Sequence, residues 1–167
     1  ACQTAPKKST DSIQKQGVWT AKILLKQKNK KSYTMNAHVR ISEEDKSRID
    51  LTLPSGLYLA GLVSETNKFE MVVPRDKKIY RGRDGRQALK ENFGVSVSPR
   101  VLSHVFTNEP IRDKNWSCSE NEEKKTFTCR NLRTRVAIQW LGRSGQTKKV
   151  NIRSRNVIAK LLIRSKN

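Results

Sequence analysis

Three cysteines are the residues in this 167-residue chain whose type and spacing could most readily do chemistry. Cys118 and Cys129 lie in the run WSCSENEEKKTFTC, in which two short strand-like stretches flank the turn-prone residues ENEEKK. A hairpin over this run would bring the two thiols face to face. We therefore expect a structural disulfide, worth about 2 to 4 kcal/mol if unstrained, and an oxidising compartment.

Pairing these two residues leaves Cys2 as a single cysteine within the polar run ACQTAPKKSTDSIQKQG. Ile13 is the only large apolar residue of that run, so the run cannot bury enough surface to offset its ordering entropy. We expect residues 1–16 to form a flexible N-terminal tether. In an oxidising compartment, a leftover cysteine at the start of a mature chain suggests acylation, which makes Cys2 a candidate lipid anchor.

Catalytic and metal-binding patterns have little support in the remaining residues. The two histidines, His38 and His104, are accompanied by no CxxC spacing, which disfavours zinc. Nucleophilic catalysis needs a base held beside its nucleophile, and neither histidine has an evident acid partner or oxyanion loop. The run GRDGR lacks the lysine of a nucleotide-binding loop and fits a turn before a helix. We expect no enzyme activity, no metal and no cofactor.

The charge balance is the strongest compositional signal. The chain has 35 Lys and Arg against 15 Asp and Glu, a net charge of +20, and no acidic residue follows Lys124. Such a field attracts polyanions without specifying which, although a well-hydrated surface would also account for it. Trp19, Trp116 and Trp140 fall within patterned strands instead of alternating with basic residues on one exposed face, so nucleic acid is a disfavoured partner.

Period-two alternation dominates the chain and predicts a broad, curved antiparallel sheet of about eleven strands. In SYTMNAHVRI, for example, the apolar residues from Tyr33 to Ile41 alternate with polar ones. The predicted strands are 18–26, 32–41, 47–54, 56–64, 68–74, 77–82, 115–119, 125–130, 134–142, 148–155 and 156–164. On the last strands several basic residues have mostly the opposite parity to the apolar ones, which predicts a basic surface on the convex side: Arg135, Lys149, Arg153, Lys160 and Arg164.

Two amphipathic helices interrupt this pattern in the middle of the chain. The first follows Asp84, a candidate cap, and stops at Gly94; the second has Ser98 as its cap, begins at Pro99 and ends before Pro110. These helices must cover the apolar face of the sheet, because no second sheet is available to do so. Either the face is packed solid, or an unfilled hydrophobic cleft remains that could bind an apolar ligand.

The segment from Leu51 to Ile111 resembles the central part of the bacterial lipoprotein-localisation proteins (LolA/LolB-like). The shared order is a strand ending in Pro and Gly, two further strands, a short strand containing Tyr, a helix ending near FG, and a helix that starts at Pro. The resemblance is closer to the outer-membrane receptor LolB than to the soluble periplasmic carrier LolA. It implies a mainly β fold, an eleven-stranded antiparallel half-barrel (an unclosed barrel) over 17–167, lidded by helices at about 84–109.

The same resemblance implies a hydrophobic cavity that accepts lipoprotein acyl chains or other lipids, with Cys2 acylated. Expected cavity residues are Trp19, Ile23, Leu25, Met35, Val39, Ile49, Leu51, Leu59, Phe69, Met71, Leu89, Leu102, Phe106, Ile138 and Trp140. Receptors of this family carry an exposed leucine in a Pro-x-Gly loop that is proposed to enter the bilayer. Here the loop is Pro54, Ser55, Gly56 and Leu57, so that Ser55 takes the place of the leucine and Leu57 follows two residues later.

These expectations give two hypotheses of function. The first is a protein anchored by lipid to the outer membrane and facing the periplasm. It binds the acyl chains of lipoproteins or other lipids and passes them to the inner leaflet of that membrane. A soluble periplasmic carrier is one candidate source of the acyl chains. The second is a non-transporting periplasmic adaptor or scaffold that binds an anionic partner through its basic sheet face. A fluorescent fatty-acid analogue distinguishes them, because only the first requires a site for apolar chains.

Overall fold

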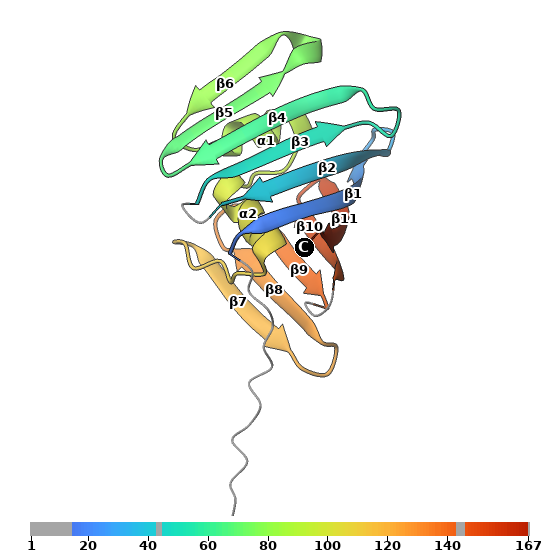
Figure 1. Ribbon diagram of the computed structural model, residues 1–167. Helices are drawn as coiled ribbons and strands as arrows, with labels where there is room; N and C mark the ends of the chain where they lie inside the picture. The colour runs from blue at the N-terminus through green and yellow to red at the C-terminus, as the bar shows by residue number, and fades with distance from the viewer. Residues whose placement is uncertain (1–14, 43–44, 143–145, 167) are drawn as a thin grey trace, which may run out of the picture.

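The computed structural model describes residues 15–42, 45–142 and 146–166, and within them the chain forms one antiparallel sheet and two α-helices (Figure 1). Cys2 and nearly all of the expected tether therefore lie outside the described residues. The strands before the helices are β1 (Gly17–Gln27), β2 (Tyr33–Ile41), β3 (Ser47–Thr52), β4 (Tyr58–Glu65), β5 (Lys68–Val73) and β6 (Lys78–Gly82). The strands after them are β7 (Trp116–Asn121), β8 (Thr126–Asn131), β9 (Ala137–Leu141), β10 (Thr147–Ser154) and β11 (Val157–Ser165).

The eleven strands lie in the order β6-β5-β4-β3-β2-β1-β11-β10-β9-β8-β7. The first and last strands of the chain thus pair at the centre, and β6 and β7 are the two free edges of an unclosed sheet. The predicted fold class, a mainly β half-barrel with about eleven antiparallel strands, is confirmed. No helix within the described part of the chain is long and apolar enough to cross a membrane.

Alternation along each strand determines which side chains are buried. In β2, Met35, Ala37, Val39 and Ile41 are buried, whereas the residues between them are exposed. Antiparallel pairing continues this pattern across the sheet, because residues directly opposite each other share a face. One face of the sheet is therefore mainly apolar, and the two helices lie on it (Figure 1).

The two helices begin and end close to the expected residues. Helix α2 (Pro99–Thr107) begins as predicted, with Ser98 Oγ accepting a hydrogen bond from the Val101 amide at 3.2 Å. Its last turn ends at Asn108, in the left-handed conformation, two residues before Pro110. These contacts fix the direction in which α2 enters and leaves the apolar face.

The expected cap of helix α1 (Arg86–Phe93) was wrong by one residue. Gly85 is the N-cap, and Asp84 instead accepts a hydrogen bond from the Arg86 amide at 3.0 Å from outside the helix. A Cβ at Gly85 would lie 2.5 Å from the Phe69 ring, so the close approach of backbone and ring favours glycine there. The predicted stop at Gly94 is confirmed, with φ +76°.

The predicted disulfide joins Cys118 of β7 to Cys129 of β8, which are directly opposite each other in the β7–β8 pair. Cys129 is fully buried and Cys118 is half-buried against the same core. Because β7 is a free edge of the sheet, the disulfide ties that edge covalently to its neighbour.

Candidate functional site

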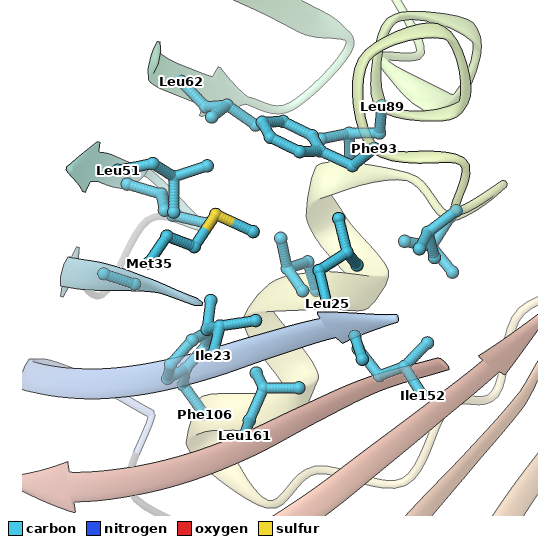
Figure 2. A pocket seen from close by; sticks show the side chains of 16 residues that line it. Ile23, Leu25, Met35, Leu51, Leu62, Leu89, Phe93, Phe106, Ile152 and Leu161 are labelled. Carbon is cyan, nitrogen blue, oxygen red and sulfur yellow. The ribbon is translucent and has the colours of Figure 1, made fainter. Parts of the chain in front are cut away.

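A small cavity lies between the apolar face of the sheet and the two helices. Its walls are entirely apolar, and its volume is about 70 Å³. Side chains from both halves of the sheet and from both helices converge on it (Figure 2). The lining residues are Ile23, Leu25, Met35, Ala37, Ile49, Leu51, Leu62, Leu89, Phe93, Val95, Val97, Leu102, Phe106, Ile152, Ala159 and Leu161.

The structure brings about half of the expected cavity residues to this space. Those that line it are Ile23, Leu25, Met35, Ile49, Leu51, Leu89, Leu102 and Phe106. The others belong to the surrounding core, where Trp19, Val39, Phe69, Met71, Ile138 and Trp140 are buried and Leu59 is half-buried. The residues named from the sequence therefore belong to one apolar core or pack against it, but only part of that core borders the cavity.

Sequence reasoning missed the other half of the lining. Leu62, Ile152, Ala159 and Leu161 lie on the buried parity of their strands, so the alternation already marked them as inward-facing. The remaining missed residues are Ala37 of β2, Phe93 at the end of α1, and Val95 and Val97 in the segment between the helices. The alternating VSV of that segment was a usable signal, because both valines are buried while Ser96 between them is half-buried.

The cavity is smaller than the cleft that the sequence allowed. Leu89 and Phe93 of α1 and Phe106 of α2 project toward the cavity (Figure 2), and Leu102 of α2 also lines it. An apolar cavity of about 150 Å³ is enough for one benzene molecule, and this one holds less than half of that volume. An acyl chain could therefore enter only if these helical side chains moved away from the sheet.

The C-terminal end of α2 is fastened to the sheet by polar contacts. Trp140 of β9 donates its indole N–H to the carbonyl oxygen of Val105 at 3.2 Å, in a buried hydrogen bond. Lys148 of β10 donates from Nζ to the carbonyl oxygen of Phe106 and to Oδ1 of Asn108. A cation at the last carbonyls of a helix also interacts favourably with the helix dipole.

Helix α1 has fewer attachments. Only Ala88 and Leu89 of its eight residues are buried. A hydrogen bond joins its end to the sheet, from Gln27 Nε2 of β1 to the carbonyl oxygen of Phe93 at 3.3 Å. Gly94 follows directly against Val157, where a Cβ would come within 2.5 Å of a valine methyl group. Helices α1 and α2 are thus joined to the sheet by hydrogen bonds at their C-terminal ends and by apolar packing elsewhere.

The Pro-x-Gly loop is a tight turn between β3 and β4. Leu53 and Leu57 close it through a backbone hydrogen bond of 2.8 Å, and Gly56 has φ +93°, a conformation that favours glycine. Leu57 is 54% exposed, and Pro54 and Ser55 are exposed beside it. The expected membrane-contact residues therefore project together from the sheet, with one large apolar side chain among them.

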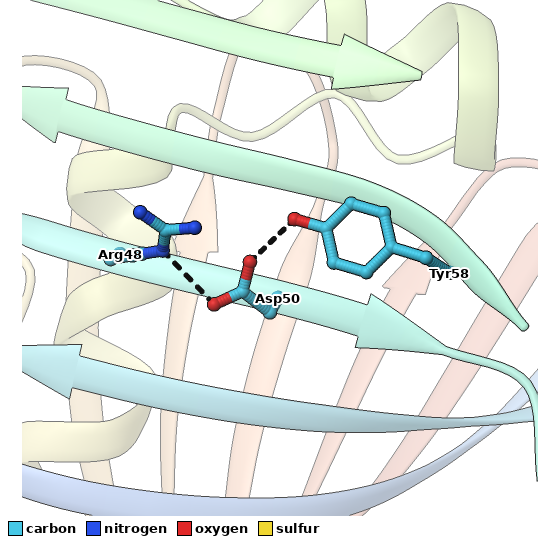
Figure 3. Close-up of polar contacts among 3 residues, drawn as sticks. All are labelled: Arg48, Asp50 and Tyr58. Carbon is cyan, nitrogen blue, oxygen red and sulfur yellow. Dashed lines mark hydrogen bonds and ion pairs between the residues drawn. The ribbon is translucent and has the colours of Figure 1, made fainter. Parts of the chain in front are cut away.

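Polar contacts hold the strand that follows this loop. Tyr58 donates a hydrogen bond to Asp50, whose other oxygen accepts from Arg48 Nε at 3.1 Å (Figure 3). Partial burial alone would raise the pKa of Asp50, but the hydrogen bonds from Tyr58 and Arg48 outweigh it and lower that pKa. The Tyr58 ring also lies across Gly61, where a Cβ would collide with the phenol oxygen. The base of the loop is thereby fixed on the outer face of the sheet.

Four of the five expected basic residues lie on that outer face. Lys149, Arg153, Lys160 and Arg164 are exposed on β10 and β11, opposite in parity to the buried residues. Arg135 is exposed but does not belong to a strand: it lies in the turn before β9 with φ +60°. The strand predicted from residue 134 begins only at Ala137, because the β8–β9 turn extends further than its sequence suggests.

No protein-family model matches the sequence, and a search of curated proteins found no match. Among solved structures, the chain is similar to a domain from Vibrio parahaemolyticus described as an outer membrane lipoprotein-sorting protein. That match has 11% identity and a TM-score of 0.52, and it covers 90% of this chain and 86% of the other. A LolA superfamily protein from Nitrosomonas europaea has 12% identity and a TM-score of 0.46, with 92% of this chain and 87% of that one covered. The chain therefore has the fold of the Vibrio parahaemolyticus domain, which is here an unclosed antiparallel sheet of eleven strands with two helices on one face.

Proposed function

We propose that the protein binds the acyl chains of lipoproteins or other lipids between the concave face of its sheet and its helical lid. The observation that carries this proposal is the cavity between them, which is lined entirely by apolar side chains from both halves of the sheet and from both helices. A polar ligand would find no hydrogen-bonding partner on these walls, and desolvating it there would be unfavourable.

The cavity must open before a chain can enter, and the attachments of the lid suggest how. The C-terminal end of α2 is held by Trp140 and Lys148, whereas α1 rests mainly on apolar contacts. In this proposal α1 and the start of α2 move away from the sheet while the end of α2 stays in place. Acyl methylenes then replace the side chains of Leu89, Phe93 and Leu102, each methylene contributing about 0.8 kcal/mol by its burial.

The finer part of the proposal concerns place and partners. The disulfide is consistent with an oxidising compartment such as the periplasm. We propose a receptor similar to LolB, attached to the outer membrane through an acylated Cys2, that receives acyl chains from a soluble periplasmic carrier. Leu57 would take the membrane-contacting place of the family's loop leucine, because it is the large apolar side chain exposed at that turn.

Titration of the full chain with a fluorescent fatty-acid analogue tests the proposal. We expect a saturable signal that palmitate reverses. Leu102→Ala shortens a half-buried lid side chain that lines the cavity, so it should bind the analogue more tightly. Leu132→Ala is the matched control, because Leu132 is 75% exposed and lies outside the cavity. A wild-type protein and a Leu102→Ala variant that both give no competable signal would contradict the proposal.

A further inference from the structure

A second hollow lies on the opposite, outer face of the sheet, and the lid does not cover it. This outer groove has a volume of about 710 Å³ and crosses the central strands. Its outward-facing lining consists of Lys22, Leu24, Thr34, Asn36, Pro54, Leu141, Lys149, Asn151, Lys160 and Leu162. The acyl-chain proposal makes no use of it.

Strand register shows that these residues form two adjacent rows. In the first row, Asn36, Lys22, Leu162, Lys149 and Leu141 are direct neighbours across β2, β1, β11, β10 and β9. In the second row, Thr34, Leu24, Lys160 and Asn151 are direct neighbours across β2, β1, β11 and β10. Lysine, leucine and uncharged polar side chains are therefore mixed in both rows.

Three lysines surround Leu162 in this arrangement. Lys22 and Lys149 are its direct partners on either side, and Lys160 is the diagonal neighbour of both. Diagonal neighbours in an antiparallel sheet are about 7–8 Å apart, so the three ammonium groups can reach one common point. None of the three forms an ion pair with a described carboxylate, and the groove lining has no acidic residue. Asp50, in the adjoining hollow, is already paired with Arg48.

The leucines make the groove amphipathic. Leu162 is 39% exposed and Leu141 is 38% exposed, each directly beside Lys149 in the first row. Pro54 forms part of the lining, which joins the groove to the turn that exposes Leu57. An apolar turn beside a basic groove is the combination that favours the interface of an anionic bilayer.

We propose that the outer groove is a binding site for the phosphate headgroups of anionic phospholipids at a membrane surface. The phosphate would accept hydrogen bonds from the ammonium groups of Lys22, Lys149 and Lys160, and Leu162 and Leu141 would contact the apolar part below the headgroup. Charge complementarity favours an anionic ligand, and the exposed leucines favour an amphiphile. The groove lining contains no aromatic side chain on which a base could stack, so it does not favour nucleic acid.

Vesicle co-sedimentation with the full chain tests this site. The probes are vesicles of phosphatidylglycerol mixed with phosphatidylcholine, and vesicles of phosphatidylcholine alone. We expect binding to the first at low salt, weakening as salt rises, and little binding to the second. The groove variant carries three substitutions: Lys22→Gln, Lys149→Gln and Lys160→Gln. Each basic residue near an anionic surface changes the partitioning of a protein onto the membrane about five-fold. The triple variant should therefore bind on the order of 100-fold more weakly.

The control variant removes the same charge elsewhere: Lys78→Gln, Lys114→Gln and Lys124→Gln, all exposed and outside the groove. It should keep most of the binding. Equal losses in both variants, no preference for phosphatidylglycerol, or tighter binding of single-stranded RNA that depends on the same three lysines would each overturn the proposal. Fatty-acid titration of the groove variant separates the two sites, because its cavity should bind the analogue as the wild type does.

Discussion

Lys148 lies on the lid side of β10, and its ammonium group donates a hydrogen bond to the carbonyl oxygen of Phe106, 42 residues earlier in the chain. The lysine is only 6% exposed and lies on the same buried face of its strand as Val150 and Ile152. Its neighbour Lys149 points to the opposite face and is exposed. Two adjacent lysines thus serve different purposes, one inside the fold and one in the outer groove.

Lys148→Met tests the fastening of α2. Methionine retains the apolar stem but leaves the Phe106 carbonyl without this donor, and losing a hydrogen bond to a charged group costs about 1.5–3 kcal/mol. We expect the free energy of unfolding in urea to fall by about that amount, and the fatty-acid analogue to bind faster because the lid is looser. Lys149→Met is the control on the same strand and should change stability by less than about 0.5 kcal/mol. Equal stability of the two variants would contradict a structural role for Lys148.

The role of Lys148 shows where sequence reasoning succeeds and where it stops. Alternation in runs such as YTMNAHVRI predicted the strands, and Ser98 followed by Pro99 predicted the start of α2, because these signals are local. The alternation of its strand directs the Lys148 side chain inward, although a charged side chain is usually exposed. Its hydrogen-bond partners come from α2, which is distant in the sequence, so the strand alone could not reveal them. The size of the cavity was equally unpredictable, because it depends on how deeply Phe93 and Phe106 project toward the sheet.

We expect His104 to make the stability of the fold depend on pH. Burial on α2 lowers its pKa, with Glu109 and Asp113 opposing that effect, and its Nδ1 has no hydrogen-bond partner among the described residues. The unfolded chain then binds a proton at higher pH than the folded one does. Stability should therefore decrease as pH falls from about 6.5, the ordinary pKa of histidine, toward the lower folded pKa.

Urea unfolding as a function of pH measures this effect. His104→Gln should remove part of the decrease between neutral pH and the folded pKa of His104. His38→Gln is the control, because His38 is exposed on the outer face of β2. A wild type and a His104→Gln variant with the same pH profile would show that burial of His104 has no energetic consequence.

Tyr58→Phe should raise the pKa of Asp50. The hydrogen bond from the Tyr58 phenol helps to hold the pKa of Asp50 below its ordinary value. The stability that the ionised Asp50 contributes is therefore fully present above about pH 4. It is lost as the pH falls through the lower pKa of the folded state. NMR titration of the Asp50 carboxyl carbon measures the change. Tyr80→Phe is the control, because no hydrogen bond joins Tyr80 to Asp50 in the described structure. An unchanged Asp50 titration in Tyr58→Phe would contradict the contact.

Removing the disulfide should destabilise the β7 edge of the sheet. We expect Cys118→Ser with Cys129→Ser to lower the free energy of unfolding by about 2–4 kcal/mol, the usual range for a disulfide of this kind. Urea unfolding of the variant, and of the wild type with and without a reductant, measures the loss. Insensitivity of the wild type to complete reduction would show that the covalent link adds nothing to strand pairing.

The central claim is that acyl chains bind between the sheet and the helical lid. Photo-crosslinking with a diazirine-bearing palmitate, followed by mass spectrometry of the labelled peptides, tests it most directly. The account predicts labels on cavity residues such as Met35, Leu62 and Phe106, and loss of those labels when unlabelled palmitate competes. Labels confined to the outer face, or labels that palmitate does not displace, would contradict it.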